Sequence, residues 1–194
     1  EKHHPHIHMM AWSADPEQGY LTEKGIEQMR SQLSNDIFQD ELLSLYQEKD
    51  LSYQEVRDAA MEAMGRLIRE MKSGFCDSPI IASQMETLAG MLTEVKGKKM
   101  YGYLKKPVKA QVDAIVDELA RLPEVAECYE QWNRLRDELE RYYKDTPREH
   151  KPLSQQQEFK AIKNMVIREA EELRLSTFTF EDASMKDEVD EDQE

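Results

Sequence analysis

The stretch EVAECYEQWNRLRDELERYYK, residues 124–144, decides the fold class of this chain. Its apolar and aromatic side chains recur every three or four positions, the spacing that places them on one face of an α-helix. They are Val125, Cys128, Tyr129, Trp132, Leu135, Leu139 and Tyr142. Pro123 separates the stretch from the helical pattern that precedes it, because proline cannot continue a helix. The sequence therefore predicts an amphipathic helix over 124–144.

The same period predicts five more helices, over about 22–49, 52–74, 79–97, 107–122 and 154–174. Thr22 can cap the first of them, and Ser52 and Ser154 each begin a capping-box pattern. Residues 6–12 mix β-favouring and large apolar side chains before a turn at 13–19, and predict one short strand. Residues 176–180 predict a further strand or extended chain, and the acidic residues 181–194 predict a disordered tail. The expected fold class is mostly α.

The chain has 194 residues and a formal net charge of −14. Nucleic-acid binding needs Lys and Arg, so this charge argues against a primary DNA-binding surface. Half of the imbalance lies in residues 181–194. The sequence has no apolar run long enough to span a membrane, so we expect no membrane insertion. With only two cysteines we expect no disulfide scaffold, and the expected compartment is the cytoplasm. Because the chain begins with Glu1 rather than methionine, we expect a fragment with a missing upstream part.

His6 and His8 stand two positions apart in the predicted strand, so both imidazoles would point to one side of it. Imidazole nitrogens bind Mn²⁺, Zn²⁺ and similar ions, so the pair fits half of a three-histidine metal site. It also fits two partly exposed histidines without a metal, and a further alternative is the remnant of an affinity tag. A small histidine-based metal-binding protein is a further reading, which predicts metal binding by this chain alone.

Several segments together resemble one enzyme family. They are HPHIHMMAWS (4–13), GYLT (19–22), Gly25-Ile26, YGYLKKP (101–107), LPEVAECY (122–129) and SQQQEFKAIKNMVIR (154–168). The first three look like the third motif of HUH relaxases, and the whole set resembles the MobL-type mobilisation relaxases. The likeness extends over most of residues 4–182.

This resemblance implies an enzyme that nicks one DNA strand at a transfer origin during plasmid or transposon mobilisation. It makes His6 and His8 two of three ligands for a divalent metal (Mn²⁺, Mg²⁺ or Zn²⁺), with His4 a weaker candidate. The metal polarises the scissile phosphate, and a tyrosine expected upstream attacks it, so no catalytic residue is expected in this chain and it should be inactive alone. DNA at the transfer origin is the expected partner, with relaxosome or coupling proteins possible.

On this interpretation residues 1–21 are the end of a truncated nickase domain, 22–97 and 98–180 are two helical blocks, and 181–194 are the tail. Within the second block, a basic and aromatic cluster fits contact with single-stranded DNA through phosphates and stacking. It consists of Lys98, Lys99, Tyr101, Tyr103, Lys105 and Lys106. The alternative for these residues is a solvated loop whose tyrosines cap the core. The alternative for the whole chain is a non-catalytic helical interaction or adaptor module derived from a relaxase.

Overall fold

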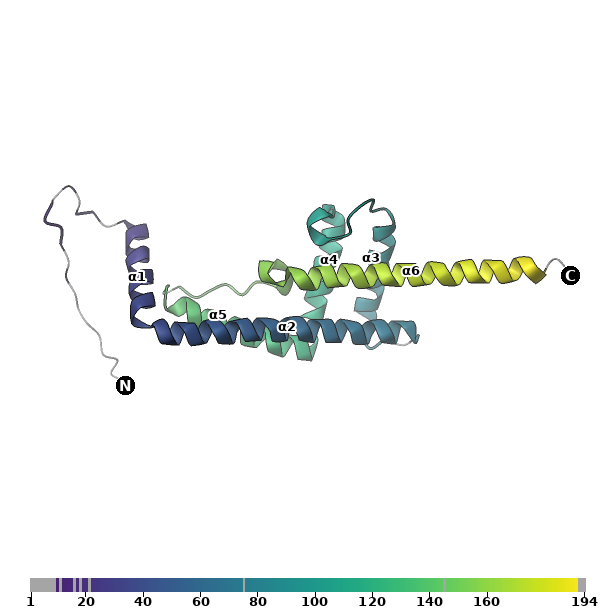
Figure 1. Ribbon diagram of the computed structural model, residues 1–194, viewed down its shortest axis with the longest axis horizontal. Coiled ribbons are helices and arrows are strands. Elements are labelled where there is room, and N and C mark those ends of the chain that lie inside the picture. The colour runs from purple at the N-terminus through teal and green to yellow at the C-terminus, as the bar shows by residue number, and fades with distance from the viewer. Residues whose placement is uncertain are drawn as a thin grey trace.

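The computed structural model describes residues 10, 12–15, 17, 19–20, 22–74, 76–144 and 146–191, with side chains up to residue 176. These residues form six α-helices and contain no β-strand (Figure 1), which confirms a mostly α fold. The predicted strand 6–12 falls mainly on residues outside the described ones. Met10 and Trp12, which are described, lie in no strand and are highly exposed.

The helices are α1 (Glu23–Ile37), α2 (Gln39–Lys72), α3 (Pro79–Thr93), α4 (Lys106–Leu119), α5 (Pro123–Arg141) and α6 (Lys160–Glu191). Three short 3₁₀ helices connect them: η2 (Tyr101–Tyr103), η3 (Leu153–Gln155) and η4 (Gln157–Phe159). In Figure 1, α2 and α6 run lengthwise while α3 and α4 cross between them. The helix α2 packs mainly against α5, and α3 packs against both α4 and α6.

One continuous apolar core joins α2, α3, α4, α5 and α6. Its largest fully buried side chains include Trp132 and Phe159, whose rings meet edge to face with centroids 5.0 Å apart. Side chains from both predicted helical blocks contribute to this core, so the blocks pack as one body. A smaller cluster of Leu42, Leu45, Leu135 and Leu139 extends the contact between α2 and α5.

The boundary predicted between the first two helices was wrong. The chain breaks at Phe38, and α2 continues without interruption through Ser52, which is buried inside the helix and caps nothing. The break follows from packing: the Ser34 hydroxyl donates to the carbonyl oxygen of Tyr142 at 2.6 Å, and the Phe38 ring lies edge-on to the Tyr142 ring. Thr22 does cap α1, since its Oγ1 accepts from the Gly25 N–H.

The strand or extended chain predicted at 176–180 was wrong. Instead α6 continues through these residues to Glu191 and extends past the other helices (Figure 1). Disorder of the acidic residues 181–194 stays a prediction. Because residues 160–191 contain no glycine or proline, nothing in the backbone ends the helix once its packed first half has formed.

Candidate nucleic-acid interface

The segment between α3 and α4 concentrates positive charge. Six lysines and no acidic residue occur between positions 95 and 112, in a chain whose net charge is −14. The segment contains η2 and continues into the first turn of α4, where Pro107 suits the second helical position because its missing N–H is not needed there. Lys96, Lys98, Lys105 and Lys106 are exposed, so most of this charge faces solvent.

Two of the six predicted contact residues hold the segment in place. Tyr101 is half-buried, its backbone N–H donates to the Asn164 side chain at 3.0 Å, and its hydroxyl donates to Asp113 at 2.7 Å. Lys99 forms an ion pair with Glu171 of α6 at 2.5 Å. These bonds fix the loop to α4 and α6, which fits the expectation that a tyrosine here caps the core.

The other four predicted contact residues are accessible. Tyr103 is 70% exposed, and the Nζ of Lys98 lies 5.9 Å from its ring centroid. Lys105 and Lys106 are exposed at the start of α4. An exposed ring beside free ammonium groups is the combination that binds single-stranded nucleic acid, through stacking and phosphate contact. Whether these residues contact DNA stays a prediction.

A groove of about 420 Å³ lies beside this segment. One wall is Tyr101, Gly102 and Lys109, and the other is residues 154–157 with Lys160 and Lys163. No acidic residue is among its described lining residues. Lys109 is not among the predicted contact residues, although it belongs to the lysine-rich segment. Lys160 was not predictable from the sequence, because only the tertiary fold brings α6 to this loop.

Two acidic residues of α4 hold the walls of the groove together. Asp113 pairs with Lys163 of α6 at 2.7 Å as well as with Tyr101. One turn later, Asp117 accepts from both the backbone N–H and the hydroxyl of Ser154 at 2.9 Å. Ser154 therefore does not cap the last helix as predicted, since α6 begins only at Lys160. Both carboxylates are bonded within the protein, and neither is among the residues that line the groove.

Of the three lysines that line the groove, Lys163 is held in place by contacts with the protein. Its side chain is only 9% exposed, and its Nζ lies 4.0 Å from the Tyr101 ring centroid. Burial lowers the pKa of Lys163, but its contacts with Asp113 and Tyr101 outweigh burial and leave this pKa above its ordinary value. Lys163 is thus a charged structural group rather than a free phosphate ligand.

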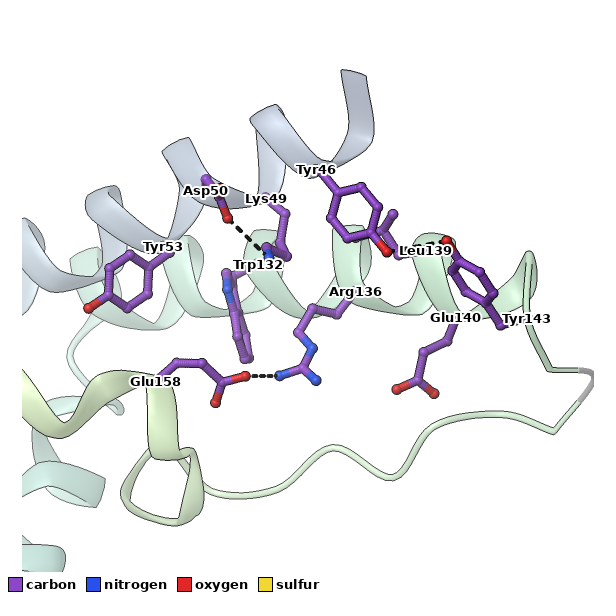
Figure 2. Close-up of a pocket in the computed structure, with 10 residues that line it drawn as sticks. All are labelled: Tyr46, Lys49, Asp50, Tyr53, Trp132, Arg136, Leu139, Glu140, Tyr143 and Glu158. Carbon is purple, nitrogen blue, oxygen red and sulfur yellow. Dashed lines mark hydrogen bonds and ion pairs between the residues drawn. The ribbon is translucent and has the colours of Figure 1, made fainter. Parts of the chain in front are cut away.

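A second pocket, of about 400 Å³, opens between α2 and α5 (Figure 2). Its charged side chains are largely paired, as Arg136 with Glu158 at 2.6 Å shows. The hydroxyls of Tyr46 and Tyr143 lie 3.2 Å apart. Burial and then Tyr46 raise the pKa of Tyr143 to about 12, so its phenolate is disfavoured. A nucleophilic tyrosine needs the opposite shift, and this pocket does not supply one.

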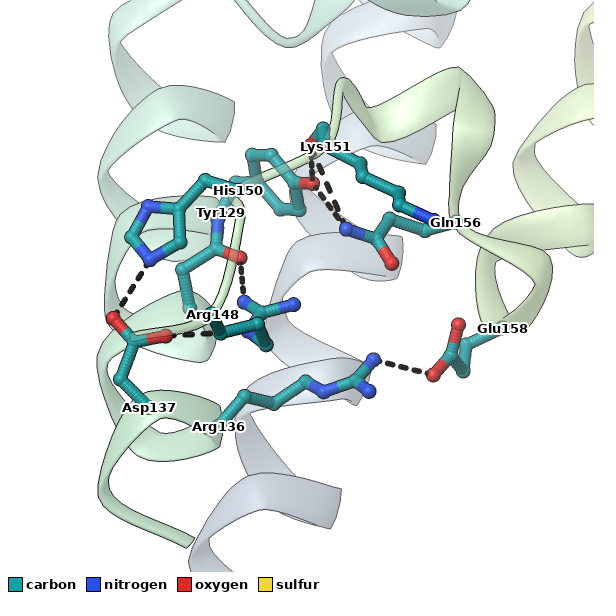
Figure 3. Close-up of polar contacts among 9 residues, drawn as sticks. Tyr129, Arg136, Asp137, Arg148, His150, Lys151, Gln156 and Glu158 are labelled. Carbon is teal, nitrogen blue, oxygen red and sulfur yellow. Dashed lines mark hydrogen bonds and ion pairs between the residues drawn. The ribbon is translucent and has the colours of Figure 1, made fainter. Parts of the chain in front are cut away.

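The segment before η3 is held against α5 by polar contacts (Figure 3). Asp137 accepts from Arg148 at 3.2 Å and pairs with His150 at 2.7 Å, while Arg148 also bonds to Asn133. The Tyr129 hydroxyl donates to the carbonyl oxygen of Lys151 at 2.5 Å. These contacts position the segment that leads into the wall of the groove.

The predicted metal ligands His4, His6 and His8 lie outside the described residues. In the part of the chain that is described, no three or more His, Cys, Asp or Glu side chains come together in a group that could hold a metal ion. His150, the histidine that is described, pairs with Asp137 and belongs to the polar network of α5. The metal site therefore stays a prediction on the N-terminal histidines.

Comparison with known proteins gives one match. The family model of the MobL relaxases covers residues 1–194, the full sequence. The chain belongs to the MobL relaxase family. No curated protein and no solved structure matches it.

Membership of the MobL relaxases confirms the family resemblance and makes this chain a member of a DNA-nicking, DNA-binding enzyme family. Relaxases typically use a divalent metal. Among the described residues, none of the helices is both long and apolar enough for a membrane span. The lysine-rich segment carries exposed positive charge, which DNA binding requires.

Proposed function

We propose that this chain is part of a relaxase that nicks one DNA strand at a transfer origin during plasmid or transposon mobilisation. The match of the MobL family model to residues 1–194 carries the proposal. The acid-free lysine segment between positions 95 and 112 supports it, because an exposed basic surface on an acidic protein is suited to bind a polyanion.

In this proposal His6 and His8, with His4 as a weaker third candidate, hold a divalent cation. That cation would supply charge neutralisation at the scissile phosphate. A tyrosine upstream of these residues would attack the phosphorus and form a phosphotyrosine link to the 5′ end, releasing the 3′ hydroxyl of the other side.

The helical part would hold DNA near the cut. Lys98, Lys105 and Lys106 would contact backbone phosphates, and Tyr103 would stack on a base. Lys99 and Tyr101 would keep the loop in position through Glu171, Asn164 and Asp113. This arrangement separates the residues that touch DNA from those that shape the surface.

Nicking of a supercoiled plasmid that carries the transfer origin tests this function in the complete encoded protein. We expect the double substitution His6→Ala with His8→Ala to abolish the nicked product at any Mn²⁺ concentration. His150→Gln is the matched control, because His150 is half-exposed in a structural network, and it should keep wild-type nicking. Full nicking by the double variant would overturn the assignment of the two histidines.

A second candidate function is the non-catalytic adaptor, and one observation favours it. Ile26, Met29, Leu33 and Ile37 form a stripe along α1, and each is at least 50% exposed. A contiguous exposed apolar stripe is typical of a protein–protein interface. An adaptor predicts no specific binding to transfer-origin DNA by the intact protein, whereas the relaxase predicts such binding.

A further inference from the structure

We propose that the groove between η2 and η3–η4 is a binding site for one backbone phosphate of a single DNA strand, with Lys109 and Lys160 as its direct ligands. This inference rests on the proposed function and adds to it a defined site away from the N-terminal histidines. The groove residues Lys109, Lys160 and residues 154–157 were not among the predicted DNA contacts.

The lining of the groove is positively charged, which favours an anionic ligand. Three lysines line it and no acidic residue does so among the described residues. Lys163 is neutralised by Asp113 at 2.7 Å. In the described part of the chain neither Lys109 nor Lys160 pairs with a carboxylate; Lys109 donates only a 3.3 Å hydrogen bond to the Gly102 carbonyl oxygen. The groove therefore keeps two uncompensated ammonium groups, which can both bind the single negative charge of a phosphodiester.

The size of the groove favours a single strand over a duplex. A volume of about 420 Å³ lies near the lower end of the range for small-molecule sites, which suits a nucleotide-sized group. A phosphate of a single strand can enter such a recess with its sugar, because that strand is free to bend. A duplex holds its phosphates on a stiff cylinder and would meet mainly the rim of the groove.

The surrounding rings fix where a base could stack. The Tyr101 ring is occupied by cations, since Lys163 lies 4.0 Å and Lys109 lies 5.4 Å from its centroid. Tyr103, two residues further along η2, is 70% exposed and available to a base. Tyr103 would therefore stack on the nucleotide adjacent to the bound phosphate. The exposed amides of Gln155 and Gln157 lie on the opposite wall and can hydrogen-bond to sugar or base.

Asp113 and Asp117 act as positioning residues for this site. Asp113 ties η2 to α6, and Asp117 ties η3 to α4. Their bonds set the separation of the two groove walls without placing a carboxylate in the lining. An acidic protein can in this way keep one local surface positive.

Fluorescence anisotropy with a labelled mixed-sequence single-stranded oligonucleotide tests the site in the intact protein. The groove variant is Lys109→Gln with Lys160→Gln. The control is Lys24→Gln with Lys72→Gln, which makes the same charge change on exposed residues outside the groove. We expect the groove variant to bind about tenfold more weakly at low salt, and the control to change affinity less than about twofold. Loss of the one phosphate contact should also lower the magnitude of the slope of log K against log salt by about 0.7.

A labelled duplex of the same length separates the strand types. The groove variant should lose much less affinity for the duplex than for the single strand, and circular dichroism should match the wild-type spectrum. If the groove variant binds single strands as tightly as the control does, the groove assignment is wrong. That result would not affect the proposed DNA-nicking function, which the nicking assay tests separately. Equal losses on both DNA forms would overturn the single-strand assignment. Wild-type protein that binds neither DNA form would overturn the groove proposal and the DNA contacts of the helical part, whereas the nicking assay tests the enzyme separately.

Discussion

Replacing Asp113 with Asn tests whether the ion pair behind the groove organises it. The wild-type carboxylate forms an ion pair with the Lys163 Nζ at 2.7 Å and accepts a hydrogen bond from the Tyr101 hydroxyl at 2.7 Å. Asparagine keeps an acceptor for the tyrosine but loses the negative charge. The Lys163 ammonium, whose side chain is 9% exposed, then stays desolvated without a counter-charge.

The cost follows from the exposure of the two partners. Removing one partner of a fully buried ion pair destabilises a protein by about 3–5 kcal/mol. The Asp113 side chain is 32% exposed, so solvent already screens part of this interaction. We expect Asp113→Asn to reduce the free energy of unfolding by about 2–3 kcal/mol, which corresponds to a midpoint lower by roughly 1 M in urea.

Equilibrium urea unfolding, followed by circular dichroism, measures this loss. The double variant Asp113→Asn with Lys163→Met removes the stranded charge and puts a side chain of similar length in its place. It should regain about 1–2 kcal/mol relative to Asp113→Asn alone. A loss below about 0.5 kcal/mol for Asp113→Asn, or a double variant no more stable than the single one, would refute the role given to this pair.

Two further predictions concern stability. Phe159 is fully buried and stacks on Tyr53 with centroids 5.0 Å apart, so Phe159→Ala should cost about 3–5 kcal/mol in urea unfolding; a cost under about 1 kcal/mol would contradict its central place in the core. For Asp137, burial raises the pKa, but hydrogen bonds from His150 and Arg148 outweigh it and leave the pKa below its ordinary value. The ionised Asp137 therefore contributes stability above about pH 4 that is lost as pH falls through the lowered pKa. Asp137→Asn should lose less stability than wild type between pH 5 and pH 3, and parallel pH profiles would argue against this coupling.

Local signals predicted the helices in the middle of the chain to within a few residues. Prolines stand at positions 79, 107 and 123, in the first or second position of α3, α4 and α5, where they favour a helix start. The junction at Phe38 was missed because distant contacts with Tyr142 set it. The capping-box pattern at Ser52 was misleading, since the packing of α2 against α5 carries the helix through it. Propensity predicts where a helix can form, and tertiary packing decides where it ends.

The candidate interface was predictable only in part. The run of lysines around η2 is visible in the sequence, but its division into accessible and anchoring residues is not. Tyr101 and Tyr103 look equivalent along the chain, yet one donates to Asp113 and the other is 70% exposed. Only the fold brings Lys160 beside Lys109 and turns Asp113 and Asp117 inward. These contacts could not be predicted from local sequence, because each joins segments that are far apart in the chain.

The direction in which α4 presents its acids explains how a chain of net charge −14 can keep a basic surface. If Asp113 and Asp117 faced solvent beside Lys109, they would cancel most of the local positive potential within one Debye length. Instead Asp113 is paired with Lys163, and Asp117 is bonded to Ser154. Glu171 of α6, which contacts the loop through Lys99, is also paired with Arg174. The net charge of this protein thus says little about polyanion binding, because Asp113 and Glu171, which contact the lysine segment, are each paired with a cation of the protein.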